Sequence, residues 1–274
     1  MNWKSNGRAP RQLRASRPQL PHAVFAAVPA RAAEVVSSNV VGYQKLTIPA
    51  SGYALLANPF TIVGSDGEGF AINDMFTGDE ENSQAGNNSA LGDQLQVWDS
   101  SIQGYTTYFF SARTTPAKQW AAVATPRVAT TETFNLGDGY WYLNRKETSY
   151  DLTVSGEVST KEVEVTLAPG YTLVCNPFPA DLPLNDENIN WAATKATAGN
   201  NSALGDQIQI WDIDVQGYTT YFFSARTTPA RQWAAVATPR VATTDSIPAG
   251  QGFWYLNRGT EDITITLKSP LAAD

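Results

Sequence analysis

One stretch of the chain occurs twice and is nearly unchanged in its second copy. Residues 85–131 align without gaps to residues 198–244 at an offset of 113, and only six positions differ. The match continues more weakly outside this block, where Gly-Tyr-x-Leu-x-x-Asn-Pro-Phe begins at Gly52 and again at Gly170. Solenoid and propeller repeats have periods of about 20–50 residues. The repeated unit is therefore predicted to be a whole domain.

Both copies show the pattern of short strands joined by turns. Runs rich in β-branched and aromatic residues are separated by Gly, Pro, Asn and Ser, and helix is a minor expectation around 71–76 and 185–193. The predicted fold class is all-β, with two tandem homologous β-sandwich (jelly-roll-like) domains. The strands expected up to the start of the second copy are 40–48, 53–57, 94–98, 105–111, 120–128, 140–144, 150–158 and 162–167.

The first 33 residues differ from the rest of the chain. They contain six basic residues and no acidic one, followed by a short apolar patch at 23–28 and small residues at 30–33. That order is typical of a secretory signal peptide, although three prolines interrupt it; the alternative is a disordered upstream extension or a misplaced start. The predicted division is 1–33 signal or extension, 34–156 first β-domain and 157–274 second β-domain. The expected location is secreted or at the cell surface.

Charge limits the partners of the two domains. Six of the 19 basic residues lie in the leader, which leaves 13 against 26 acidic residues, a net charge near −13. Such a body repels nucleic acid and anionic membrane surfaces, so no nucleic-acid partner is expected. No apolar run approaches the roughly 20 residues of a transmembrane helix. The single cysteine, Cys175, aligns with Ala57 and is predicted to be a small buried side chain.

Strand alternation places an indole on a polar face. In the first copy Leu95 and Val97 share one face, so Trp98 falls on the other with the neighbouring glutamines. An aromatic ring beside amides is a platform on which a sugar ring can stack; alternatively, Trp98 caps the core rim or packs on its hairpin neighbour. The candidate ligand-binding residues are Gln94, Gln96, Trp98, Tyr105, Tyr108 and Trp120 in the first copy and Gln207, Gln209, Trp211, Tyr218, Tyr221 and Trp233 in the second. The tyrosines, Trp120 and Trp233 could extend the platform across adjacent strands, or they could equally be cross-strand pairs that stabilise the sheet.

Other residues give weaker signals. Trp141 and Trp254 are predicted to be core residues, because so bulky a strand needs burial on at least one face. Loop 87–93 offers oxygen atoms that could bind calcium, but a local Asn/Gly turn is the favoured interpretation. Asn87 also begins a formal N-glycosylation sequon.

The inventory for catalysis is poor. His22, the only histidine, lies in the leader, which removes histidine-based triads and metal sites from the two domains. A carboxylate pair from Asp93, Asp99 and Asp138 is the remaining route to glycoside hydrolysis. The prediction is therefore no enzyme, no catalytic residue, no metal and no cofactor.

The motifs together resemble a known family. Val-Val-Gly-Tyr at 40–43, Gly-Asp-Gln-x-Gln-x-Trp-Asp followed by Gly-Tyr-Thr-Thr, and Pro-Ala-Gly-Gln-Gly-Phe-Trp at 248–254 resemble secreted β-rich repeat proteins of planctomycete and verrucomicrobial bacteria. The resemblance covers about residues 34–270 and implies that the mature chain begins near the Val-Val-Gly-Tyr segment. It implies no activity for particular residues.

Three functions follow in order of preference. The leader, the acidic body and the duplication favour a secreted or surface-associated, non-catalytic protein with a structural or adhesive role, with self-assembly as one expected form of association. The first alternative is a tandem carbohydrate-binding module whose two sites raise avidity for a polysaccharide or another cell-surface component. A glycoside hydrolase or lyase comes last.

Overall fold

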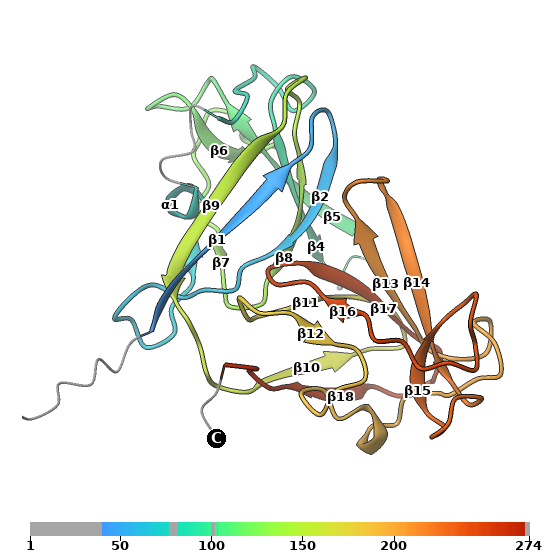
Figure 1. The fold of residues 1–274 in the computed structure, drawn as a ribbon. Helices are drawn as coiled ribbons and strands as arrows, with labels where there is room; N and C mark the ends of the chain where they lie inside the picture. The colour runs from blue at the N-terminus through green and yellow to red at the C-terminus, as the bar shows by residue number, and fades with distance from the viewer. Residues whose placement is uncertain (1–39, 77–81, 100–101, 103, 272–274) are drawn as a thin grey trace, which may run out of the picture. The chain divides into compact units, whose positions relative to one another are not determined.

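Antiparallel β-strands make up almost all of the secondary structure (Figure 1). The computed structural model describes residues 40–76, 82–99, 102 and 104–271. Within these residues the only helices are α1 (Ile72–Met75) and a 3-10 turn at Trp191–Ala193, and both lie in segments where helix was expected. The predicted all-β fold is confirmed.

The first copy of the repeat forms a five-stranded antiparallel sheet. Its strands, in spatial order, are β2 (Tyr53–Ala57), β8 (Gly139–Leu143), β4 (Gln94–Asp99), β5 (Gly104–Ser111) and β6 (Gln119–Ala122). Strands β4 and β5 are the expected hairpin, in register from Gln94 opposite Phe109 to Asp99 opposite Gly104. Two short strands, β3 (Phe70–Ala71) and β7 (Thr133–Phe134), pair separately.

A two-stranded ribbon covers the inner face of this sheet. It consists of β1 (Val41–Ile48) and β9 (Tyr150–Glu157), which run side by side in Figure 1. The ribbon buries Leu152 and Val154 in the same cluster as Leu56 and Leu95 of the sheet. Each such side chain contributes about 1.5–3 kcal/mol on burial. This sheet-on-ribbon core holds together what we call module 1, residues 40–158.

The second copy repeats the same order of strands. Its core is a separate cluster between the sheet and the ribbon, and we call it module 2, residues 159–271. The five-stranded sheet is β11 (Gly170–Cys175), β17 (Gly252–Asn257), β13 (Gln207–Asp212), β14 (Gly217–Ser224) and β15 (Gln232–Ala235); the ribbon is β10 (Val163–Leu167) with β18 (Ile263–Leu267); the short pair is β12 (Leu182–Pro183) with β16 (Ser246–Ile247).

The chain passes from one module to the other between β9 and β10. Val158 still belongs to the core of module 1, while Val163 packs against the core of module 2. The predicted boundary after residue 156 falls one residue before the end of β9. Residues 38–274 form a single compact unit, so contacts between the modules are part of one folded body.

The alternation expected in the central hairpin is present in both copies. Leu95 and Ile208 are fully buried, and Ile210 is 8% exposed. Val97 packs against the core from a partly buried position. A strand places successive side chains on opposite faces, so the glutamines and the indole of each copy lie on the outer face of the sheet.

The strand expected at 120–128 is shorter than predicted. Strand β6 ends at Ala122, because the chain then turns: Thr125 N donates to Ala122 O and Val128 N donates to Thr125 O. Pro126 has no N–H and cannot continue a ladder. The β-branched residues of this segment suggested a strand, but three of them face solvent in the turn.

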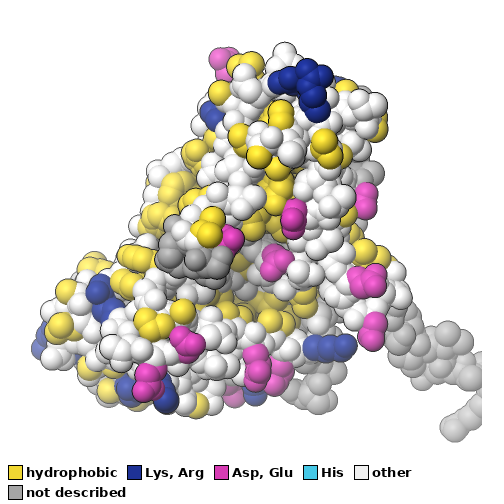
Figure 2. Space-filling model, turned by 180° about the vertical axis from the view of Figure 1, so that it is seen from behind, with side chains coloured by type: hydrophobic (Ala, Val, Ile, Leu, Met, Phe, Trp, Pro, Cys, Tyr) yellow, Lys and Arg dark blue, Asp and Glu magenta, His cyan; other side chains and the backbone are white. Residues whose placement is uncertain are grey.

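Charged side chains are spread thinly over the surface. On the face shown in Figure 2, acidic side chains are scattered among polar and apolar ones rather than gathered in one patch. The ion pairs between described residues are Lys45–Asp151, Lys195–Glu261 and Lys268–Glu162. All six side chains are exposed, and solvent screens such pairs. Apolar packing therefore carries the stability of both modules.

The leader prediction lies outside the described residues, since residues 1–33 are not among them. In the part of the chain that is described, no helix has the length and apolar character needed to cross a membrane.

Candidate functional site

Aromatic side chains from the outer faces of the two sheets meet in a contact that we call the aromatic seam. Trp98 of module 1 meets Trp254 of module 2 edge to face, with ring centroids 5.1 Å apart. Trp141 of module 1 meets Trp211 of module 2 in the same manner at 5.0 Å. The full seam consists of Tyr53, Trp98, Tyr105, Trp141, Tyr171, Trp211, Tyr218 and Trp254.

The seam is reciprocal. Trp98 and Trp211 are equivalent positions of the repeat, as are Trp141 and Trp254, and both cross-module pairs have an interplanar angle of 86°. This is the pattern of an isologous interface, in which the same patch on two units is self-complementary. Edge-to-face pairs contribute about 0.5–1.5 kcal/mol beyond area burial. The two modules thus contact each other as the subunits of a two-fold dimer do.

The predicted burial of Trp141 and Trp254 is confirmed, but the seam buries them and not the core of their own modules. Both are buried, at 7% and 8% exposure, but neither points into the core of its own module. Strand parity places Tyr140 and Tyr142 on the inner face, so Trp141 between them must point outward. The opposite module, rather than the sheet's own core, buries each indole.

The seam also limits how much of the Trp98 and Trp211 rings a ligand could contact. Each is partly buried and packs on the opposite tyrosine of its hairpin, Tyr105 at 5.1 Å and Tyr218 at 5.0 Å. Each also meets an indole of the other module. Because these contacts already surround both rings, the geometry lends little support to two independent sugar platforms.

Four of the candidate ligand residues face the opposite way. Trp120 and Trp233 are 1% and 0% exposed, and Tyr108 and Tyr221 are 7% and 5% exposed. Tyr108 lies three residues after Tyr105, and an odd separation in a strand puts two side chains on opposite faces. The prediction that these residues extend a surface platform is therefore wrong; they belong to the two cores.

The four candidate glutamines lie on the outer faces, but hydrogen bonds already hold them. Gln94 Nε2 donates to Ser89 O at 2.5 Å, and Gln96 Nε2 donates to Gln94 Oε1 at 3.0 Å. In module 2, Gln207 and Gln209 form the same ladder. These amides tie each hairpin to its preceding loop.

Tyr105 and Tyr218 keep the most accessible positions among the candidates, at 40% and 43% exposure. Trp254 Nε1 donates to the hydroxyl of Tyr218 at 3.1 Å. Partial burial raises the pKa of both tyrosines above its usual range. They line the rim of the seam.

The carboxylates at the start of each central hairpin have a structural role. Asp93 and Asp206 are fully buried. Asp206 accepts hydrogen bonds from Thr197 N, Arg258 N and the Tyr255 hydroxyl at 2.7–2.9 Å, and Asp93 has the equivalent three donors. Burial raises the pKa of Asp93 despite these bonds. Each carboxylate joins three segments of its module and is closed off from a substrate.

Loop 87–93 is a local turn in this structure. Asn88 Oδ1 accepts from Ala90 N, and Asn88 O accepts from Leu91 N and Gly92 N. Side-chain to backbone bonds of this kind are what the turn interpretation predicts. No group of three His, Cys, Asp or Glu side chains gathers anywhere in the described residues.

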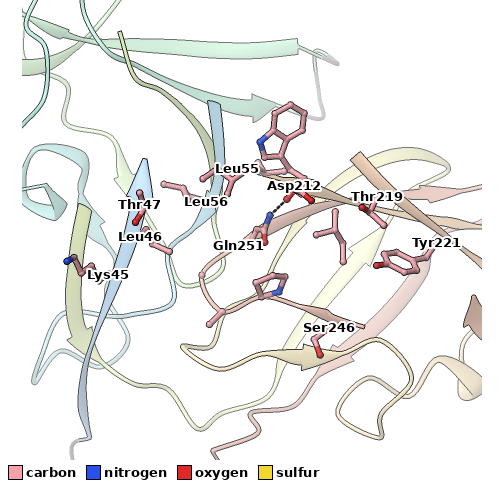
Figure 3. Close-up of a pocket in the computed structure, with 16 residues that line it drawn as sticks. Lys45, Leu46, Thr47, Leu55, Leu56, Asp212, Thr219, Tyr221, Ser246 and Gln251 are labelled. Atoms are coloured by element: carbon pink, nitrogen blue, oxygen red, sulfur yellow. Dashed lines mark hydrogen bonds between the residues drawn. The ribbon is translucent and has the colours of Figure 1, made fainter. Parts of the chain in front are cut away.

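A cleft of about 420 Å³ opens between the modules (Figure 3). Module 1 contributes residues 45–47 of β1 and 55–56 of β2, and module 2 contributes 210–213, Thr219, Tyr221, Ser246 and 248–251. Small-molecule sites typically have volumes of about 300–1,000 Å³ and favour junctions between domains. The cleft is the candidate functional site of this chain.

The hairpin turn after β13 forms one end of the cleft. The sequence did not predict a contact between this turn and module 1. Gln216 donates to Tyr53 O at 2.9 Å and accepts from Tyr53 N at 2.8 Å, and Ile213 packs against the core of module 1. A signal did exist: three of the six differences between the copies fall in this turn, at 213–215.

Comparison with known proteins adds no name to this geometry: no protein-family model, curated protein or solved structure matches the chain.

Proposed function

We propose that this chain is a secreted or surface-associated, non-catalytic protein with a structural or adhesive role. The observation that carries the proposal is the aromatic seam, which joins two stable β-modules into one body. A rigid pair of sheets with little surface charge suits a load-bearing or contact-forming part outside the cell. Of the carboxylates considered for hydrolysis, Asp93 accepts buried hydrogen bonds that join segments of module 1, and its equivalent Asp206 does the same in module 2.

Fractionation of the producing cells tests the location. An antibody against residues 40–271 should detect the protein in the medium or on intact cells, with an N-terminus near residue 34 after Edman sequencing. Detection in the cytoplasm alone, with an uncut N-terminus, would overturn the proposal. The adhesive role is checked by comparing attachment of wild-type cells and cells lacking the protein to a solid surface.

A carbohydrate-binding function is the second candidate. The supporting observation is the position of Trp211 at the cleft, together with hydroxyl, amide and carboxylate side chains. That geometry favours a site between the modules over a separate site on each sheet.

A further inference from the structure

The floor of the inter-module cleft is apolar. Leu46, Leu55 and Leu56 of module 1 line it together with Ile210 of module 2; in Figure 3 Leu55 lies on the side of β2 nearer Asp212, whereas Leu56 points toward Leu46 of β1. Leu55, Leu56 and Ile210 are buried, at 1%, 4% and 8% exposure, and Leu46 is the partly exposed side chain of this floor. Such a floor can take the apolar face of a ring.

The rim of the cleft carries polar atoms that the protein does not use. Thr219 and Ser246 line it, and their hydroxyls make no hydrogen bond within the described residues. Asp212 accepts from Asp214 N and Val215 N through Oδ1 alone, which leaves Oδ2 open. Gln251 donates to the carbonyl of Trp211 through Nε2 and keeps Oε1 as an acceptor.

Charge at the cleft disfavours an anion. Lys45 is the one cation among the lining residues, and its ammonium is paired with Asp151 at 2.7 Å. Asp212 adds a carboxylate on the other side. An anionic ligand would meet this carboxylate without a free cation to offset it.

We propose that the cleft binds one neutral sugar residue of a glycan per chain. A sugar ring has an apolar face for the partly exposed Leu46 and hydroxyls for Thr219, Ser246 and Asp212. A purely apolar ligand would leave those rim groups without partners, at a cost of about 1–3 kcal/mol each once they are shielded from water. The inference gives the adhesive role a ligand, and it rests on the proposed function only for the source of that glycan.

The cleft takes its polar rim residues from module 2 although the chain is duplicated. The equivalents of Asp212 and Thr219 in module 1 are Asp99 and Thr106, and neither lines the cleft. The two copies of the repeat therefore contribute different residues to this cleft. One site per chain separates this proposal from a tandem binding module, which predicts two.

The duplication supplies a matched control for the test. Thr219 and Thr106 occupy equivalent, exposed positions in β14 and β5, so Thr219→Val and Thr106→Val make the same chemical change at and away from the cleft. Both variants should keep the unfolding midpoint of the wild type. The probes are neutral gluco-, manno- and xylo-oligosaccharides and, as the anionic comparison, oligogalacturonate, each titrated calorimetrically into the full chain.

The expected result is binding of at least one neutral oligosaccharide with a stoichiometry of one. Thr219→Val should weaken it about tenfold, the equivalent of one lost hydrogen bond, and Thr106→Val should leave it unchanged. The proposal is overturned by binding of none of the neutral probes, by two sites per chain, by tighter binding of oligogalacturonate, or by equal effects of the two valine variants. These outcomes do not depend on where the protein is found. The titrations therefore test the glycan site, and fractionation tests the proposed location independently.

Discussion

The sulfur of Cys175 occupies the space that a side chain at Gly139 would need: a Cβ built on Gly139 would lie 1.9 Å from Cys175 Sγ. The two residues come from different modules, β8 of module 1 and β11 of module 2. Cys175 is buried, as its alignment with Ala57 predicted. The contact fixes how closely the two sheets approach each other.

Gly139→Ala should therefore destabilise the protein by about 1–3 kcal/mol through overpacking, measured as the free energy of unfolding in urea. Cys175→Ala removes the sulfur and leaves its Cβ 3.6 Å from the new methyl group. The double variant should recover most of the loss caused by Gly139→Ala. Strictly additive effects of the two substitutions would show that the modules do not pack in this way.

The reciprocity of the seam predicts matched losses. Trp141→Ala and Trp254→Ala each remove an indole that is buried against the other module, and each should cost about 3–5 kcal/mol in urea unfolding. The two values should agree within about 1 kcal/mol, because the contacts are equivalent. Val215→Ala is the control at 72% exposure. A loss below about 1 kcal/mol for either tryptophan would contradict the seam.

Loss of the hydroxyl should change protein stability differently at the two tyrosines of β8, Tyr140 and Tyr142. The Tyr140 hydroxyl is buried without a hydrogen-bond partner, and module 2 has Phe253 at the equivalent position. Tyr140→Phe should be neutral or stabilising, because the buried hydroxyl has no compensating bond. Tyr142→Phe removes a donor from buried Asp93 and should cost about 1.5–3 kcal/mol. Thermal melts of both variants would show the contrast, and equal shifts in Tm would disprove it.

The sequence predicts the fold but only part of the candidate site, for physical reasons. Alternation of side chains placed Leu95 inside and Trp98 outside, because that choice depends on one strand alone. The outward face of Trp141 could also have been found by parity, but its burial could not, since the other module supplies it. The cleft depends on the same docking and on the turn at 213–215, where the differences between the copies mark a changed position but do not show what it contacts.

The asparagine of the Asn-Pro-Phe motif is predicted to tolerate no charge. Asn176 is fully buried; its Nδ2 donates to Ala180 O, Ile247 O and Pro248 O, and its Oδ1 accepts from Phe178 N. Asn176→Asp would set a carboxylate oxygen against those carbonyls, with an expected loss of at least about 3 kcal/mol.

The control is Asn190→Asp, an exposed position where Oδ1 accepts from Ala193 N and an aspartate can do the same. Urea unfolding at pH 7 compares the two variants. A stable Asn176→Asp protein would mean that the Asn176 amide does not hold these backbone segments together.

Buried tyrosines should lower the free energy of unfolding at alkaline pH. Burial raises the pKa of Tyr140, Tyr142 and Tyr255 far above the usual value. Above pH ~10 the unfolded chain therefore releases protons that the folded chain retains. The stability contribution is complete below pH ~10 and falls as pH rises beyond it, by up to about 1.4 kcal/mol per pH unit for each group.

Urea unfolding between pH 8 and pH 11 measures this slope, and absorbance at 295 nm reports tyrosine ionisation. The buried tyrosines should ionise only as the protein unfolds. Tyr140→Phe should reduce the slope by one group, whereas Tyr43→Phe, at a side chain that is 76% exposed, should leave it unchanged. A free energy of unfolding that stays level through pH 11 would contradict the burial of these phenols, because linkage requires stability to fall wherever the folded state holds more protons.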